Sequence, residues 1–90
     1  MSARPRDPSP RESFSDDPDV DRLLQMVAML KAKRIAKGFT LRQLSRMMNV
    51  DFTHLSRSER GLTQPGLVIL MRWCRALDLE IESLFRKTRR

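Results

Sequence analysis

The 90-residue chain is long enough for one small domain, and a domain of this size buries only a modest core. One cysteine and one histidine exclude an internal disulfide framework and a metal site built from several Cys and His ligands. The net charge of +7 is unevenly distributed along the chain. Residues 1–21 carry three basic and six acidic side chains, whereas residues 22–90 carry fifteen basic and five acidic side chains.

The basic surplus of residues 22–90 attracts phosphate backbones or anionic membranes. A membrane-surface helix would need a basic face opposite a strongly apolar one, but these charges are scattered over several segments. No apolar run is long enough to cross a bilayer, and the N-terminus lacks a secretory pattern. We therefore expect a cytoplasmic protein that binds nucleic acid and no membrane.

Residues 1–16 are rich in Pro, Ser, Arg and Asp and contain one aromatic residue, Phe14. Such a segment buries too little apolar area to offset the entropy lost on folding, so a disordered tail is predicted. Its alternating Arg and Asp fit either a segment that folds on binding or a solubilising tail. The folded domain is predicted over residues 17–86, followed by a basic tail at 87–90.

The first helix is predicted from Pro18 to about Lys37. Asp17 can cap its N-terminus, and Gly38 supplies the left-handed residue that ends it. Apolar residues recur along it at helical spacing, namely Leu23, Leu24, Val27, Ala28, Leu30 and Ile35. This stripe predicts an amphipathic helix that packs on the core.

Two short helices follow. Thr40 caps the second, whose apolar face consists of Leu41, Leu44 and Met48. Asn49 is expected in the turn, since Asn tolerates positive φ. Asp51 caps a third helix that ends at Gly61.

Pro65 lies near the first position of a fourth helix, which continues to Leu77. Its apolar residues are spaced by three and four, at Leu67, Leu70, Cys74 and Leu77. A short last helix is predicted over residues 81–86. Five helices without a strand or a repeat predict an all-α domain.

The second and third helices, joined by a tight turn, have the helix-turn-helix arrangement. Steps of 100° per residue place one set of side chains of the third helix inward, namely Leu55, Ser58 and Glu59. The opposite set is polar, namely Thr53, Ser56, Arg57 and Arg60. A polar face can be simply solvated, but its position behind a turn in a basic domain favours contact with DNA.

These polar side chains suit the edges of base pairs. Arg57 can bind guanine O6 and N7 through two hydrogen bonds. Thr53 and Ser56 can meet donors or acceptors, and Phe52 can pack on a thymine methyl group or a sugar. Phosphate contacts are predicted at helix ends, from Arg42, Gln43, Arg60 and the backbone N–H groups behind Thr40. Each of these can also be an ordinary surface group.

At this point the sequence resembles the lambda-repressor-like, or Cro/XRE, family of DNA-binding domains. The similarity runs from LKAKRIAKGFTLRQLSRMMNV through DFTHLSRSERGLTQPGLVILMRWCRALDLEIESLF and covers about residues 21–85. Four features carry it. They are a Gly-apolar-Thr entry to the second helix, Asn-Val in the turn, Ser-Arg-x-Glu-Arg-Gly at the end of the third helix, and Pro65 at the start of the fourth. The resemblance implies a five-helix fold whose third helix reads bases.

The resemblance also implies that Arg34 and Glu59 pair across the first and third helices. Two positions depart from the family pattern. Leu41 stands where many members carry a glutamine that contacts DNA, so we expect it to pack instead. Ser58 stands where a larger apolar residue is usual, so we expect the core beneath either to be looser or to be filled by a neighbour such as Met47 or Met48.

Association is expected because a small core gains from a partner, and a two-fold dimer reads two inverted half-sites. The apolar residues beyond the needs of one core are Leu79, Ile81, Leu84 and Phe85. We interpret them as a homodimer interface, the other interpretation being that they seal the base of the domain.

The expected function is repression, with a homodimer on a palindromic operator of double-stranded DNA that blocks a promoter. The resemblance implies autoregulation in a bacterial plasmid, phage, restriction or toxin–antitoxin operon. Activation by contact with RNA polymerase stays open. An antitoxin that binds a co-encoded protein, and an adaptor that uses the fold mainly for protein contacts, are the alternatives.

Catalysis is not expected. Helical spacing buries Cys74 in the fourth helix and exposes His54 at the flank of the third, so the two cannot form a nucleophile–base pair. The sequence has no phosphate-binding Gly loop and no paired-carboxylate cleft, so no cofactor or metal is predicted.

Overall fold

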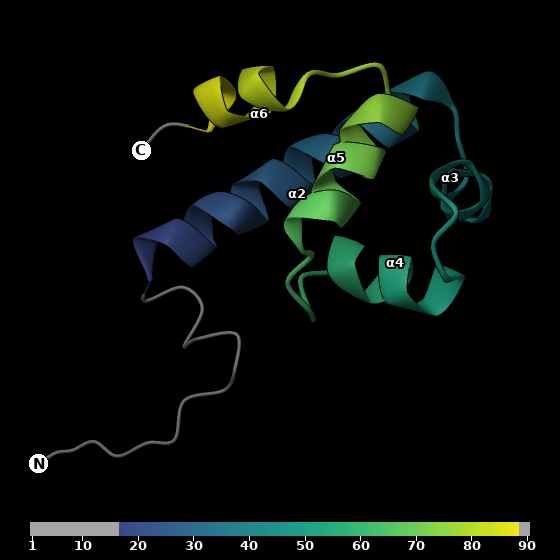
Figure 1. Ribbon diagram of the computed structural model, residues 1–90, viewed down its shortest axis with the longest axis horizontal. Helices are drawn as coiled ribbons and strands as arrows, with labels where there is room; N and C mark the ends of the chain where they lie inside the picture. Colours follow the sequence, from purple (N-terminus) through teal and green to yellow (C-terminus); the bar gives the residue numbers. More distant parts are fainter. Residues whose placement is uncertain (1–16, 89–90) are drawn as a thin grey trace, which may run out of the picture.

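The computed structural model describes residues 17–88, which form five helices and no strand. In chain order these are α2 (Pro18–Lys37), α3 (Leu41–Met48), α4 (Phe52–Glu59), α5 (Leu67–Ala76) and α6 (Ile81–Lys87), as Figure 1 shows. The all-α prediction is confirmed. The predictions for residues 1–16, and for Arg89 and Arg90, lie outside the described residues.

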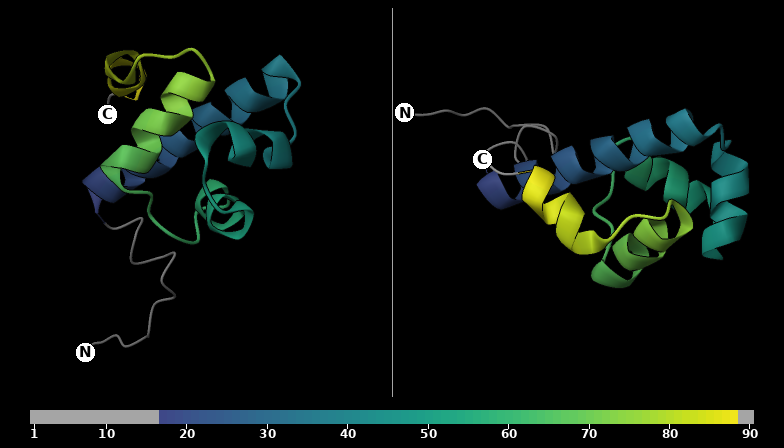
Figure 2. Two further views of the ribbon diagram at one scale, coloured as in Figure 1. Left: turned by 45° about the vertical axis from the view of Figure 1, so that its right-hand side comes forward. Right: turned by 90° about the horizontal axis from the view of Figure 1, so that it is seen from above.

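Helix α2 begins and ends where local chemistry predicts. The Asp17 carboxylate accepts a hydrogen bond from the Asp19 N–H at 2.9 Å, and Gly38 ends the helix with φ 81°. The inward face buries Met26, Val27 and Leu30. Figure 2 shows α3 at the C-terminal end of this helix and α6 beside its N-terminal half.

The stripe predicted on α2 was wrong at its C-terminal end, because the Ile35 side chain is 59% exposed. Ile35 follows Leu30 by five residues, which is about 140° around the helix. It therefore points away from the face that Leu30 buries. Ala28 is exposed as well.

Helices α3 and α4 each have a side-chain cap. The Thr40 hydroxyl accepts from the Gln43 N–H at 3.0 Å, and the Gln43 side-chain oxygen accepts from the Thr40 N–H at 2.8 Å. The Asp51 carboxylate accepts from the His54 N–H at 3.1 Å. Asn49 occupies the turn with φ 56°, as expected from its tolerance of left-handed backbone.

A single core lies between the helices. Helix α3 contacts α4 and α5, α2 contacts α4 and α6, and α5 contacts α6. The largest fully buried side chains are Trp73, Leu30, Leu44, Leu55, Leu77 and Leu84. This packing holds α3 and α4 against the rest of the domain.

Helix α5 begins at Leu67, two residues after Pro65, with Gly66 at the N-cap. Leu67 was predicted in the buried stripe, but its side chain is 62% exposed. It lies about 60° around the helix from Leu70, which is buried, so helical spacing places the two on one face. Leu67 lies in the first turn, however, where the rest of residues 17–88 covers only a minor part of it.

Helix α6 extends to Lys87, and the Thr88 side chain is buried, so ordered structure continues past the predicted end at Arg86. Arg22 of α2 binds the end of α6. Its Nη2 donates to the Phe85 carbonyl at 2.7 Å, and its Nε donates to the Thr88 hydroxyl at 3.3 Å. These contacts join the end of α6 to α2.

Candidate nucleic-acid interface

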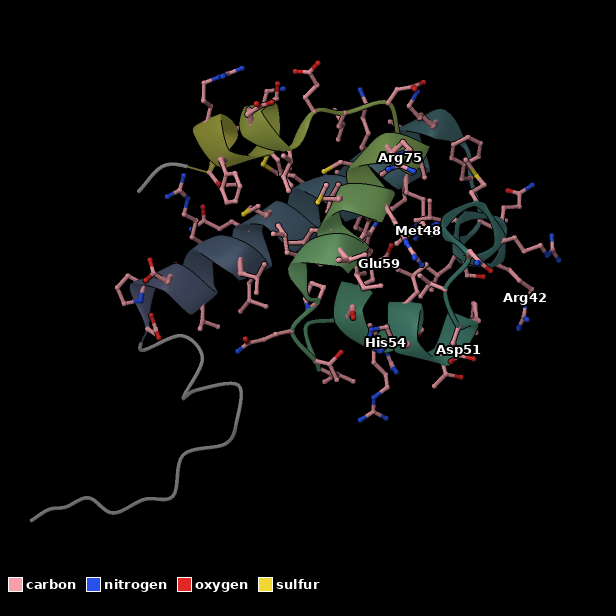
Figure 3. The ribbon with its side chains drawn as sticks, viewed as in Figure 1. Arg42, Met48, Asp51, His54, Glu59 and Arg75 are labelled. Carbon is pink, nitrogen blue, oxygen red and sulfur yellow. The ribbon has the colours of Figure 1, made fainter. Side chains whose placement is uncertain are left out.

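The turn between α3 and α4 determines how the two helices meet. The Asn49 N–H donates to the Arg46 carbonyl at 3.1 Å, and the Val50 N–H donates to the Ser45 carbonyl at 3.0 Å. These bonds end α3, and Asp51 follows directly as the N-cap of α4. Figure 3 shows Asp51 and His54 along α4 at the outer edge of the domain.

Helix α4 has one buried face and one exposed face. Leu55 and Ser58 are fully buried. The side chains of Thr53, Arg57 and Arg60 are exposed, and Ser56 is half-buried. The structure thus brings these polar residues to one surface.

The buried hydroxyl of Ser58 has a hydrogen-bond partner, because its Oγ lies 3.2 Å from Oγ1 of Thr63. Met48 packs in the core at 2% exposed, whereas Met47 is 49% exposed. Of the two methionines considered as core fillers, only Met48 belongs to the core. Leu41 is half-buried and packs against the core, in agreement with its expected apolar role.

An ion pair links the end of α4 to α2. Arg34 Nε donates to Glu59 Oε2 at 2.9 Å, and Nη2 donates to Oε1 at 3.1 Å. A third donor, Nη1, binds the Phe39 carbonyl at 2.8 Å. Both side chains are nearly buried, at 13% and 5% exposed. The pair therefore fixes α4 relative to α2 and to the segment before α3.

The first turn of α3 presents a different set of groups. The Thr40 hydroxyl and the Gln43 oxygen are engaged in the capping box, while the Gln43 amide nitrogen remains a donor. Arg42 is exposed, and its guanidinium carbon lies 4.2 Å from the centroid of the Phe52 ring. The structure thus brings together two residues to which the sequence assigned separate roles.

A helix-turn-helix family model matches residues 30–84, which is more than half of the chain. The protein belongs to the Cro/XRE-type helix-turn-helix family. This confirms the predicted family and the lambda-repressor-like fold, with α3 and α4 as the helix-turn-helix. Cro/XRE-type domains are DNA-binding domains, so the exposed face of α4 is the candidate interface.

One relative of this Cro/XRE-type protein is the "Uncharacterized HTH-type transcriptional regulator y4dL" of Sinorhizobium fredii (strain NBRC 101917 / NGR234). The two are 44% identical over 52 residues, which cover 58% of this chain and 26% of the relative. The chain thus spans about a quarter of the length of that relative. No solved structure matches the chain at a significant level.

The dimer interface predicted for this Cro/XRE-type domain needs one correction. Leu84 is 2% exposed and belongs to the core, so it offers no surface to a partner. Leu79 and Ile81 are half-buried, and Phe85 is 41% exposed. The sequence reasoning also missed a group of exposed apolar side chains around the start of α5, namely Leu62, Leu67, Val68 and Met71.

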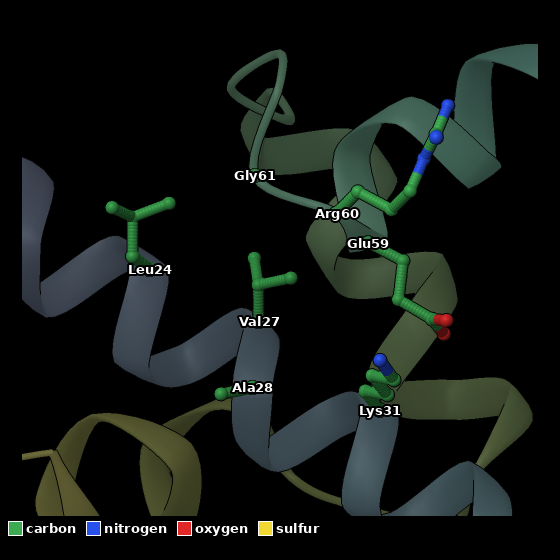
Figure 4. A pocket seen from close by; sticks show the side chains of 7 residues that line it. All are labelled: Leu24, Val27, Ala28, Lys31, Glu59, Arg60 and Gly61. Atoms are coloured by element: carbon green, nitrogen blue, oxygen red, sulfur yellow. The ribbon is translucent and has the colours of Figure 1, made fainter. Parts of the chain in front are cut away.

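An open hollow of about 480 Å³ lies between α2 and the end of α4. Figure 4 shows its lining, which consists of Leu24, Val27, Ala28, Lys31, Glu59, Arg60 and Gly61. Gly61 has φ 80°, and a Cβ atom there would lie 3.4 Å from Leu24. A side chain at this position would therefore be strained by its backbone conformation.

Cys74 and possible metal ligands are the other chemically reactive groups of the Cro/XRE-type domain considered in the sequence. Burial raises the pKa of the Cys74 thiol, whereas a nucleophilic cysteine needs a lowered pKa. Within residues 17–88, no three His, Cys, Asp or Glu side chains gather as metal ligands. No helix in that range has the length and apolar character required to cross a membrane.

Proposed function

We propose that the protein is a sequence-specific regulator of transcription that inserts α4 into the major groove of double-stranded DNA. The observation that carries this proposal is the exposed polar face of α4, a helix whose opposite face is anchored in the domain. Glu59 and Leu55 are engaged inside the domain, while Thr53 and Arg57 project outward from the same helix. A rigid helix allows short side chains to meet base edges with defined geometry.

The base contacts are assigned by chemistry. Arg57 binds a guanine through O6 and N7, which is the commonest specific contact in the major groove. Thr53 contacts a base edge or a thymine methyl group. Ser56 is half-buried, so it contacts a neighbouring base pair only where α4 lies closest to the floor of the groove. Phe52, at the first position of α4, borders this surface.

Phosphate contacts flank the groove. Arg60 follows the last residue of α4, and Arg42 occupies the second position of α3. The free N–H groups of the first α3 turn, behind Thr40, and the amide nitrogen of Gln43 add donors for the same strand. These contacts position the domain without reading sequence.

The functional unit is proposed to be a homodimer on a palindromic operator. One reading helix contacts too few base pairs for useful specificity, and a two-fold dimer doubles the site. Leu79, Ile81 and Phe85 provide partly accessible apolar surface near α6. Such a dimer represses by covering a promoter, and contact with RNA polymerase would instead give activation.

Protein binding is the second candidate function. Leu62, Leu67, Val68 and Met71 expose apolar side chains that the domain itself does not cover, which favours a protein contact. An antitoxin or adaptor would use this surface for a co-encoded protein. It would then bind DNA weakly and without sequence preference.

Selection of bound duplexes from a random pool, at about physiological salt, tests the proposal. Non-specific affinity falls steeply with salt, whereas base contacts persist. We expect an inverted repeat, and relaxed preference at one position of each half-site in Arg57→Ala. Arg75→Ala is the matched control, since Arg75 is exposed on α5 away from α4 (Figure 3). Recovery of no motif, with binding that vanishes as salt rises, would contradict sequence-specific regulation.

A further inference from the structure

We infer that Phe52 is a positioning residue that orients the Arg42 guanidinium toward a DNA phosphate. This inference rests on the proposed function and changes the role of one residue in it. Phe52 then acts through Arg42, and it does not read a base itself. The pair forms a single phosphate-binding unit that joins the first turns of α3 and α4.

The contact between the two residues is close. The guanidinium carbon of Arg42 lies 4.2 Å from the ring centroid of Phe52, well inside the range of about 6 Å for attraction between a cation and an aromatic face. The other such contact in residues 17–88, Arg22 on Phe85, has a separation of 5.6 Å. Arg42 therefore covers one face of the Phe52 ring.

Arg42 retains its hydrogen-bond donors for a ligand. Within residues 17–88 no acidic side chain forms a salt bridge with it, whereas Arg34 is fully engaged by Glu59 and Phe39. A guanidinium that lies over a ring still carries its N–H groups around its edge. The contact thus restrains the side chain and leaves its donors free.

The backbone that carries Arg42 is also held in place. Thr40 and Gln43, on either side of it, form the reciprocal capping box of α3. With the backbone fixed by the cap and the side chain restrained by the ring, less conformational freedom is lost when Arg42 binds. This pre-organisation is the physical effect that we assign to Phe52.

The position of Arg42 favours a phosphate as its ligand. It lies in the first turn of an eight-residue helix, where free backbone N–H groups and the helix dipole attract negative charge. Phe52 is half-buried and covered on one face, so it has little remaining surface for a thymine methyl group. The two residues are therefore better suited to one joint contact than to two separate ones.

The test is a double-mutant cycle on the operator selected for the wild type, with affinity measured over a series of salt concentrations. Arg42→Gln is expected to reduce affinity about tenfold and to lower the slope of log affinity against log salt by about 0.9 for each subunit, which is about 1.8 for the proposed dimer. Phe52→Leu, which keeps apolar volume but removes the ring, is expected to reduce affinity about two- to fivefold. In the Arg42→Gln background, Phe52→Leu should have no further effect.

Two matched measurements separate positioning from other roles of the ring. Phe52→Tyr retains the aromatic face and should retain wild-type affinity and salt slope. In the free protein, the Phe52 ring should shift the NMR signals of the Arg42 δ protons upfield, and this shift should disappear in Phe52→Leu. Thermal unfolding verifies that each variant is folded.

Several results would overturn the inference while leaving the proposed function intact. One is an equal loss of affinity from Phe52→Leu with and without Arg42. Another is a changed base preference that persists in the Arg42→Gln background, which would make Phe52 a base reader. Absence of the upfield shift in the wild type would overturn the contact itself. A wild type that selects no operator would instead reject the proposed function, and the positioning role with it.

Discussion

Arg34 donates two hydrogen bonds to the carboxylate of Glu59, from Nε to Oε2 at 2.9 Å and from Nη2 to Oε1 at 3.1 Å. This contact joins α2 to the last residue of α4 across 25 positions of sequence. The same guanidinium binds the Phe39 carbonyl just before α3. One arginine thus connects α4 and the segment before α3 to α2.

Removing one partner of this pair should destabilise the domain. Glu59→Ala leaves the nearly buried Arg34 without its carboxylate, and we expect the free energy of unfolding to fall by about 3 kcal/mol. Urea unfolding followed by circular dichroism measures the change. Lys37→Ala is the control, because Lys37 pairs at 3.8 Å with an Asp78 side chain that is 88% exposed. Equal effects of both substitutions would contradict a special role for the Arg34–Glu59 pair.

The contacts of Thr88 predict that α6 depends on the residue after its last turn. The Thr88 hydroxyl lies 3.1 Å from the Leu84 carbonyl, and it accepts from Arg22. Thr88→Val keeps the buried shape but removes these bonds, so the free energy of unfolding should fall by about 1 kcal/mol. Lys87→Ala, at an exposed neighbouring position, should have little effect. An unchanged unfolding midpoint in Thr88→Val would contradict a stabilising role of the Thr88 hydroxyl.

The parts of the fold that sequence predicts well are those that depend on neighbours in the chain. Asp17, Thr40 and Asp51 cap helices through groups two or three residues away, so their roles can be read locally. Helical periodicity gives the direction in which a side chain points around its helix axis. It does not show whether another helix extends far enough to cover that side chain. Leu67 has the right angle and is nevertheless exposed, because it lies in the first turn of α5.

The candidate site shows the same division. The outward direction of Thr53 and Arg57 follows from 100° steps along one helix. The contact of Arg42 with Phe52 depends on how two different helices cross, which no spacing within either helix reveals. Arg22 was missed for the same reason, since its partners on α6 are more than sixty positions away.

Burial of the Cys74 thiol predicts a pH dependence of stability. Its pKa is raised in the folded protein, because burial disfavours the thiolate. The unfolded chain therefore loses its proton first as pH rises above the ordinary cysteine pKa of about 8.5, and the free energy of unfolding should decrease there. Below that pH the thiol is protonated in both states and contributes no slope. Comparison with Cys74→Ala between about pH 7 and pH 10 isolates the effect, and identical slopes would contradict it.

Arg60 and Arg57 should have separable effects on DNA binding. Arg60→Gln removes a proposed phosphate contact from each subunit, so affinity should fall equally for all operator variants and the salt slope should decrease by about 0.9 per subunit, which is about 1.8 for the proposed dimer. Arg57→Ala should relax preference at one base pair. Fluorescence anisotropy with a set of single-base operator variants measures both properties. A sequence-dependent loss in Arg60→Gln would assign this residue to base reading.

Self-association should depend on Phe85 and not on Leu84. Phe85 is 41% exposed, so Phe85→Glu can place a charge in a dimer interface without burying it in the core, and thermal unfolding verifies that the variant is folded. We expect sedimentation to report a monomer, and operator affinity to fall roughly hundredfold because the two half-sites are no longer linked. Ile35→Glu is the control, since Ile35 is an exposed apolar residue on α2. Leu84→Glu would unfold the domain and cannot serve this test, because Leu84 is buried. If the wild type and Phe85→Glu sediment alike as folded monomers, the proposed dimer interface is wrong. The domain then binds DNA as a monomer or dimerises on DNA through another surface. The exposed apolar side chains at the start of α5 are the next candidates for substitution.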